Sequence, residues 1–486
     1  MNILLDAWIP VRARGGRRVI RPDQIAEPDV LWPDWPRADL NIACLELLVG
    51  LVHLADPAKD DEAWEARRPD SERLRAALAP FAPAFELGGD GPRFMQDIAP
   101  LEGEAKPVDM LFIDSAGEST AKKNMDLAVH RDRYPRLDAG LAAMALYTLQ
   151  SHAPSGGAGN RTSMRGGGPM VTLVQPAEPG LWPLVWANTP FGSPATMDAL
   201  PWMRPTRTSE AGQVEPPPEG GSVVPEHFFG MPRRLHLIFE GPDVVGVLQR
   251  PYGTNYTGWL HPLTPYYRQK EGSELLPVHP RPGVFGYRNW LGIVAELPDS
   301  DLRRRARTLR DYTGRVRSTE GASVIVAGWA MDNMKPLDFV LSHQPYVDVD
   351  AKVARRLHGL IEAADKIAAA LRMALRVIVD EGVVLNSLRE SFFIRTQDRF
   401  AARSAQLPAE GIERLWLTDM RRVALAIFDD AALPGLEAQE TDRIERALAA
   451  RDGLIADLSG RRKLGREAFR SLGLSLPENR RKEAQA

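Results

Sequence analysis

The sequence predicts an α+β protein with a large mixed N-terminal domain, residues 1–347, followed by a C-terminal four-helix bundle, residues 348–486. A chain of 486 residues is too long for one ordinary hydrophobic core. Most proline, glycine and tryptophan residues precede residue 345, where short strand-like runs and helical stretches mix without regular β–α alternation. From about Asp348, apolar residues recur at three- and four-residue spacing.

In the first part, apolar stretches predict helices over 40–54 and 139–149, and β-rich runs predict strands over 19–20, 171–174, 235–239 and 324–326. Another helix is expected over 302–310, with arginines 303, 304, 305, 307 and 310 around an apolar stripe. The run 248–256 alternates polar and aromatic groups and is interpreted as a hairpin.

In the second part, the apolar stripe over 353–378 predicts a long amphipathic helix. Further helices are expected over 384–402, 412–427 and 441–458, and the tail 461–472 either extends the last or forms a short extra helix. About four helices joined by short connections favour an antiparallel bundle.

Composition excludes several classes of protein. No run approaches 18 consecutive apolar residues, so no transmembrane helix or membrane partner is expected. The first residues lack the basic start of a signal peptide. The single cysteine, Cys44, fits a reducing, cytoplasmic compartment and leaves no cysteine-rich zinc site. The formal net charge of −3 does not indicate a free-standing nucleic-acid binder, so any such binding would use local basic patches within an assembly.

Motifs for catalysis are absent from the sequence. There is no Gly-x-Ser-x-Gly, no His-Glu-x-x-His and no phosphate-binding-loop lysine motif. The nine histidines have no metal-ligand spacing, so each is interpreted as a surface or core histidine. We therefore expect no enzyme activity, no metal and no cofactor.

The segment Gly328–Pro336 is the most distinctive stretch of the chain. It is expected to end the preceding strand, because Gly328 breaks the apolar run and proline does not continue a strand ladder. An apolar wedge beside amide and basic groups is what a protein presents to a minor groove when it unstacks bases. The simpler alternative is a structural hairpin whose methionines and tryptophan pack inward. The candidate wedge comprises Met331, Asp332, Asn333, Met334 and Lys335.

A second feature is the glycine-rich stretch 155–168. Glycines let backbone N–H groups approach a ligand closely, although such stretches are often only flexible turns. Its candidate ligand-contacting residues are Gly156, Gly157, Ala158, Gly159, Asn160 and Arg161.

Basic residues are scattered through the first part. Arg250 lies in the predicted hairpin, and Lys122, Lys123 and Asn124 lie in a long polar loop. Each alone fits a solvated surface, and together they are candidate phosphate contacts.

The order and spacing of short motifs resemble one family along essentially the whole chain. No single motif is very specific, but together they resemble CasA, the large subunit of the type I-E CRISPR surveillance complex Cascade. The motifs are residues 2–12, 94–96, the glycine-rich loop leading into 164–169, 232–235, 252–256, 259–265 and 331–335.

The resemblance implies recognition of the protospacer-adjacent motif of double-stranded target DNA from the minor groove, and a start to strand separation. It implies a glycine loop at 156–160, a wedge at 331–335 and a basic finger, for which Arg250 replaces the usual lysine. Lys122, Lys123 and Asn124 would contact the 5′ handle of the guide RNA and the backbone subunits. Further implied partners are the other Cascade subunits, small subunits included, and a helicase-nuclease. The cysteine cluster of some relatives is missing, so no zinc is expected.

Two other classes remain as alternatives. One is a metal-independent enzyme with an α+β core and a helical lid, which would need a pocket of convergent titratable groups. The other is a pure scaffold, which would need neither the 331–335 segment nor a glycine loop flanked by arginine.

Overall fold

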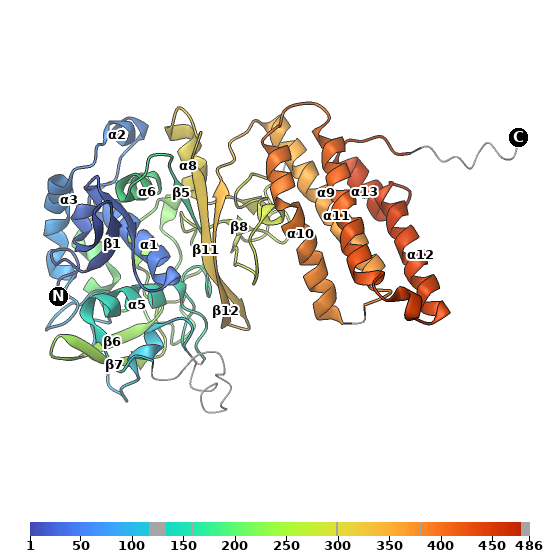
Figure 1. The fold of residues 1–486 in the computed structure, drawn as a ribbon. Helices are drawn as coiled ribbons and strands as arrows, with labels where there is room; N and C mark the ends of the chain where they lie inside the picture. Colours follow the sequence, from blue (N-terminus) through green and yellow to red (C-terminus); the bar gives the residue numbers. More distant parts are fainter. Residues whose placement is uncertain (116–132, 158, 298–299, 380, 478–486) are drawn as a thin grey trace, which may run out of the picture. The chain divides into compact units, whose positions relative to one another are not determined.

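The computed structural model describes residues 1–115, 133–157, 159–297, 300–379 and 381–477. The chain forms two compact units, shown in Figure 1. The mixed unit consists of Met1–Gly283 and Arg304–Tyr346, and the helical unit consists of Val284–Arg303 and Val347–Ala486. The helical unit is therefore built from two separate stretches of sequence.

The core of the mixed unit surrounds helix α1 (Ala38–Ala55). This helix is apolar around most of its circumference, and such helices are buried. Its length and hydropathy would suffice to span a membrane, but 89% of those residues are buried inside the structure. Helix α5 (Ala139–His152) packs beside it and begins at Asp138, whose carboxylate accepts a hydrogen bond from the Leu141 N–H (2.9 Å).

The mixed unit contains further short helices and several small sheets. Its other helices are α2 (Asp61–Ala66), α3 (Ser71–Leu78), α6 (Leu181–Ala187), α7 (Glu226–Phe229) and α8 (Arg307–Arg315). Its strands are β1 (Ile9–Ala13), β2 (Gly16–Ile20), β3 (Val30–Pro33), β4 (Leu137–Asp138), β5 (Val171–Gln175), β6 (Arg234–Glu240), β7 (Asp243–Arg250), β8 (Tyr266–Tyr267), β9 (Leu276–Pro277), β11 (Ser323–Asp332) and β12 (Lys335–Pro345); β10 is Arg303–Arg304.

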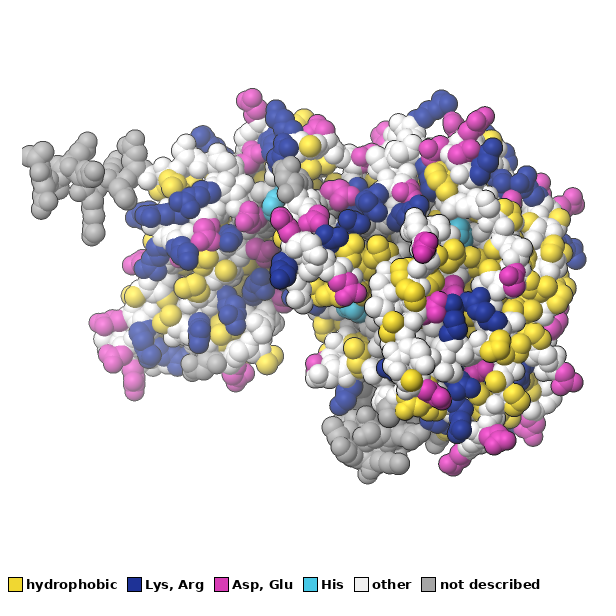
Figure 2. Space-filling model, turned by 180° about the vertical axis from the view of Figure 1, so that it is seen from behind, with side chains coloured by type: hydrophobic (Ala, Val, Ile, Leu, Met, Phe, Trp, Pro, Cys, Tyr) yellow, Lys and Arg dark blue, Asp and Glu magenta, His cyan; other side chains and the backbone are white. Residues whose placement is uncertain are grey.

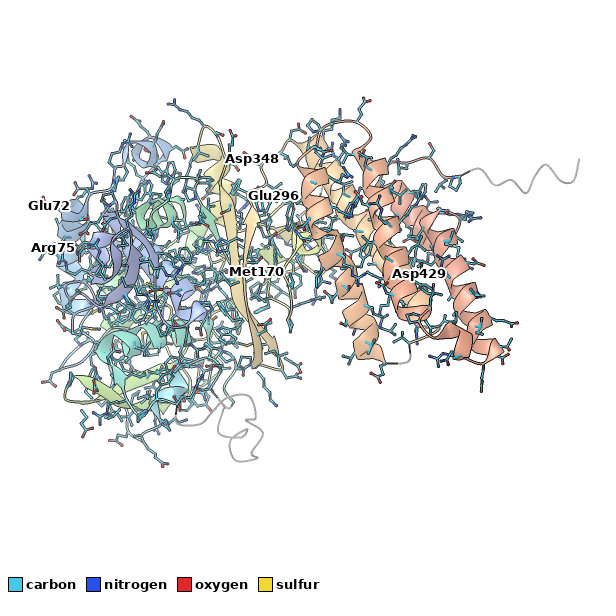
Figure 3. The ribbon with its side chains drawn as sticks, viewed as in Figure 1. Glu72, Arg75, Met170, Glu296, Asp348 and Asp429 are labelled. Atoms are coloured by element: carbon cyan, nitrogen blue, oxygen red, sulfur yellow. The ribbon has the colours of Figure 1, made fainter. Side chains whose placement is uncertain are left out.

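Two antiparallel sheets position the candidate site. One has the order β4-β7-β6, and the other has the order β12-β11-β5. Figure 1 shows β11 and β12 as two long strands along one side of the mixed unit. Met170, labelled beside them in Figure 3, immediately precedes β5, and its N–H donates to the Val278 carbonyl (3.0 Å). The sheet therefore places the end of the glycine-rich stretch next to β11.

The expected boundaries of the 328–336 segment are wrong. Gly328 lies inside β11 opposite Val340, with φ +153°. Glycine is needed at this position because a Cβ would lie 2.4 Å from the Pro169 carbonyl oxygen. Pro336 lies inside β12, opposite Met331. Because β12 is an edge strand, proline is tolerated there.

Two other expectations are also wrong. The helix expected over 302–310 begins only at Arg307, because Arg303–Arg304 form strand β10 and the ψ of Ala306, 146°, lies outside the helical range. The run 248–256 is not a hairpin of its own, because it comprises the end of β7 and the loop after it.

The helical unit has the predicted bundle of long helices. These are α9 (Ala351–Leu375), α10 (Gly382–Ser404), α11 (Ile412–Ala432), α12 (Thr441–Leu458) and the short α13 (Lys463–Ser471). The predicted stripe of α9 is buried from Val353 to Leu375. Asp429 of α11, labelled in Figure 3, accepts two hydrogen bonds from Arg451 of α12 (2.7 and 3.0 Å).

The stretch Val284–Arg303 supplies aromatic side chains to the core of the helical unit. Tyr287 stacks on Phe400 with ring centroids 4.1 Å apart, and its hydroxyl lies 2.8 Å from Thr396 Oγ1. Trp290 meets Phe400 edge to face at 5.4 Å. The helices of this unit therefore pack around aromatic residues that come before β11 and β12 in the sequence.

Candidate functional site

The predicted glycine loop forms a closed turn. The Gly156 N–H donates to the Asn160 carbonyl (3.3 Å), and the Asn160 N–H donates to the Gly157 carbonyl (3.1 Å). The side-chain amide of Asn160 also donates to the Gly156 carbonyl (3.0 Å). Ala158 lies outside the described residues. Because the chain itself uses the N–H groups of Gly156 and Asn160, those two are not free to cradle a ligand.

The three glycines of the loop lie in different surroundings. A Cβ at Gly156 would lie 2.6 Å from Arg233 Nη1, and a Cβ at Gly159 would lie 2.7 Å from Pro251 Cβ. At Gly157, which has φ +88°, an added Cβ would meet nothing within 4 Å. Packing therefore favours glycine most strongly at Gly159, a Cβ at Gly156 would press on the end of the Arg233 side chain, and Gly157 leaves open space.

The predicted basic finger, Arg250, is the last residue of β7. Its side chain is exposed, and it lies opposite Arg234 in the ladder. Arg234 is neutralised, since its Nε lies 2.6 Å from Asp97 Oδ2. Among the described residues, Arg250 has no ion-pair partner, so its charge is available to a ligand.

Two hydrogen bonds tie the end of β7 to the glycine loop. The Gln249 amide donates to Asn160 Oδ1 (3.1 Å). The N–H of Tyr252 donates to the Gly159 carbonyl (2.7 Å). The structure thus brings together the predicted glycine loop and the strand end that carries the predicted finger.

The predicted wedge is the tip of the β11–β12 hairpin. Asp332 lies opposite Lys335, and the two residues between them form the turn. Asn333 and Met334 both have positive φ, +46° and +63°, as the two-residue hairpin turn of type I′ requires. Met331 is half-buried, and the other four residues are exposed.

The hairpin tip packs against the far end of the glycine-rich stretch. A Cβ at Gly167 would lie 2.9 Å from Met334 Sδ and 3.4 Å from Met331 Sδ, and a Cβ at Gly168 would lie 2.6 Å from the Trp329 carbonyl oxygen. The methionine sulfurs therefore lie against the protein, as in the structural interpretation of the segment. Met334 nevertheless remains 44% exposed.

Ser209 links the glycine loop to the loop after β7, and sequence reasoning did not identify it. Arg161 Nε donates to Ser209 Oγ (2.8 Å), and its Nη2 donates to the Ser209 carbonyl (3.1 Å). Ser209 Oγ donates in turn to the Gly253 carbonyl (2.8 Å). Arg161 is thus occupied in holding the site together. The available signal was the long polar loop over 204–225, in which Ser209 lies.

A buried ion-pair network anchors the glycine-rich stretch to α1. Glu46 Oε1 lies 2.7 Å from His152 Nε2, and its Oε2 lies 2.7 Å from Arg165 Nη1. Burial alone would raise the pKa of the Glu46 carboxyl, but Arg165 and His152 outweigh burial and hold that pKa below its ordinary value. The network fixes the stretch between the glycine loop and the hairpin contact.

Arg233 lies directly behind the glycine loop and is 5% exposed. Its backbone is clamped by the Gln150 side chain, which accepts from the Arg233 N–H (3.1 Å) and donates to its carbonyl (3.0 Å). One guanidinium nitrogen donates to the Pro154 carbonyl. Burial lowers the pKa of the Arg233 guanidinium to about 10.

The remaining predictions concern the residues proposed to contact the guide RNA and the binding of metal. Lys122, Lys123 and Asn124 lie outside the described residues. Over the described ranges, no group of three or more His, Cys, Asp or Glu side chains is arranged to hold a metal ion. The face in Figure 2 intersperses positive and negative side chains, so on that face any attraction for an anion would be local.

Comparison with known proteins gives the class of this chain. The family described as CRISPR-associated protein Cse1 matches residues 2–427. The chain belongs to this Cse1 family, which confirms the resemblance described above.

Solved structures share the fold. CasA (Cse1) from Thermus thermophilus is similar with a TM-score of 0.73 and 18% identity, over 97% of this chain and 99% of that one. Cse1 from Thermobifida fusca has a TM-score of 0.73 and 17% identity, over 97% and 98%. A chain of a CRISPR RNA-guided surveillance complex has a TM-score of 0.71 and 17% identity, over 94% and 99%.

Proposed function

We propose that this chain is the non-catalytic large subunit of a type I-E CRISPR RNA-guided surveillance complex. In this proposal it recognises the protospacer-adjacent motif of double-stranded DNA from the minor groove and promotes strand opening and R-loop formation. Family membership and the likeness to a surveillance-complex chain support the subunit role. One observation carries the recognition step: a single glycine-rich stretch contacts both the strand end with Arg250 and the 331–335 hairpin tip.

The chemistry of these groups suits a minor groove. The groove distinguishes little beyond A·T from G·C, so a reader there tolerates related motifs. The open space at Gly157 admits a close ligand, and the charge of Arg250 suits the negative potential of the groove. Asn333 supplies an amide and Met334 an apolar surface at the hairpin tip, where a base step would be unstacked. Further sequence choice would be delegated to pairing with the guide.

The partners in this proposal are target DNA, the 5′ handle of the guide RNA, the backbone and small subunits of Cascade, and a helicase-nuclease that the chain helps to recruit. The setting would be cytoplasmic. Lys122, Lys123 and Asn124 are the proposed contacts to the guide handle and the backbone subunits. Membership of the Cse1 family and the likeness to a surveillance-complex chain support the non-catalytic role.

The test uses the complete complex with a hairpin variant, Asn333→Gly with Met334→Gly. Glycine adopts the positive φ of both turn positions, so the hairpin should persist while the amide and thioether are lost. Unstacking a base step costs a few kcal/mol. Losing about 1.4 kcal/mol of the stabilisation that offsets this cost slows strand opening about ten-fold. We expect R-loop formation on fully paired DNA to slow by about that factor, and a target pre-melted at its first pairs to restore the rate.

Met373→Ala is the matched control, because Met373 is an exposed methionine (66%) on α9, outside the hairpin. It should leave both rates unchanged. Equal defects of the hairpin variant on paired and pre-melted DNA would show that the tip does not act in strand opening. Binding of the wild-type complex that ignores the bases flanking the target would contradict motif recognition itself.

A further inference from the structure

Arg233 places a positive charge immediately behind the exposed surface of the glycine loop. Gly156 is exposed, and a Cβ on it would lie 2.6 Å from Arg233 Nη1 and 3.0 Å from Nη2. The guanidinium therefore lies against the backbone of Gly156, which is itself exposed. The absence of a side chain at this position lets the charge lie so close to the surface.

This charge has no protein counter-charge among the described residues. The donor Nη2 binds the Pro154 carbonyl, and Nε, which is buried, has no hydrogen-bond partner in the described part of the chain. The neighbouring Arg234 is paired with Asp97, and Arg165 is paired with Glu46. Arg250 and Arg161 also form no ion pair among the described residues, but Arg250 is exposed and Arg161 is bound to Ser209, so Arg233 is the buried arginine of this region without a carboxylate partner.

A buried, unpaired guanidinium is unfavourable for folding. Groups that break a local rule of stability occur at functional sites. Arg233 lies behind a solvent-exposed turn, so a counter-charge can approach it from that side. The formal net charge of the whole chain is −3. An anion that settles on the turn would supply that counter-charge.

We propose that Arg233 is a positioning residue for a backbone phosphate of nucleic acid, which it attracts through the glycine loop without being exposed itself. The phosphate would lie over the exposed backbone of Gly156 and the open space at Gly157, next to the exposed Arg250. This inference rests on the proposed function and adds to it a phosphate site that fixes the register of the duplex. It also gives the reason for glycine at position 156.

The test measures the affinity of the complete complex for a guide-matched duplex, over a range of salt concentrations, with a flanking motif selected from a randomised library. Arg233→Met should lower the affinity about ten-fold at low salt and reduce the slope of log affinity against log salt by about one. Arg233→Lys, which keeps the charge, should retain the slope. Arg315→Met is the control, because Arg315 is a buried arginine of α8 that stacks on Phe191 at 3.8 Å. It should leave the slope unchanged.

The unfolding midpoint of each variant in urea separates a charge effect from a structural one. Arg233→Met should unfold at the same or a higher urea concentration than the wild type, because it removes an unpaired buried charge. An unchanged salt slope in Arg233→Met, or an equal loss in Arg233→Lys, would overturn the proposal. If wild-type binding does not depend on the flanking bases, motif recognition fails, and the slopes on that same duplex still decide whether Arg233 attracts a phosphate.

Discussion

Replacing Gly157 by aspartate, with asparagine as the matched control, tests whether DNA approaches the glycine loop. An added Cβ meets nothing within 4 Å, so neither side chain should clash. The φ of +88° costs both variants about 1 kcal/mol relative to glycine, and both residue types tolerate positive φ better than most. The two side chains have nearly the same shape and differ by one negative charge, so their difference isolates electrostatics.

The magnitude follows from the distance of approach. A carboxylate about 4 Å from a phosphate is repelled by about 1 kcal/mol in water and by about 4 kcal/mol at an effective dielectric constant of 20. Gly157→Asp should therefore bind target DNA about five-fold to several hundred-fold more weakly than Gly157→Asn. Mobility shift of the complete complex at low salt measures the two dissociation constants. Equal constants would show that no phosphate comes near Gly157, and the loop would then be only a turn.

Two further predictions concern stability. Glu46→Gln should lower the free energy of unfolding by about 3–5 kcal/mol, because it leaves Arg165 buried without its carboxylate; a loss below about 1 kcal/mol in urea denaturation would contradict this. Burial lowers the pKa of His227 from 6.5 to about 4. Between pH 4 and pH 6.5 the unfolded chain therefore binds a proton at His227 that the folded chain does not bind. Stability conferred by a neutral His227 should be complete above pH 6.5 and fall by about 3 kcal/mol as the pH drops to 4. His227→Gln should remove that part of the pH dependence, and an identical pH profile would refute the assignment.

Local patterns in the sequence predicted the helical unit well. The stripe of α9 is buried at every predicted position from Val353 to Leu375, since helical periodicity directly encodes which face packs. The turn at Asn333 and Met334 was not recognised as a type I′ turn, because methionine rarely adopts positive φ. The roles of the glycine loop, Arg250 and the hairpin tip in DNA recognition stay predictions.

Contacts between distant residues could not be predicted from local patterns. Gly156 and Gly157 look alike in the sequence, yet only the structure shows that one faces Arg233 and the other faces open space. Gly328 was interpreted as a strand breaker, whereas it lets the Pro169 carbonyl approach a continuous strand. In each case the deciding neighbour lies far away in the chain.

The interrupted sequence of the helical unit limits how the protein can be divided. A chain that ended at Tyr346 would still contain Tyr287 and Trp290, but not Phe400, on which both rings pack. It would expose two large aromatic side chains and tend to aggregate. The same situation arises briefly on the ribosome, where these aromatics emerge well before α10 has been made. A clean separation of the units must therefore remove Val284–Arg303 as well, and join Gly283 to Arg304.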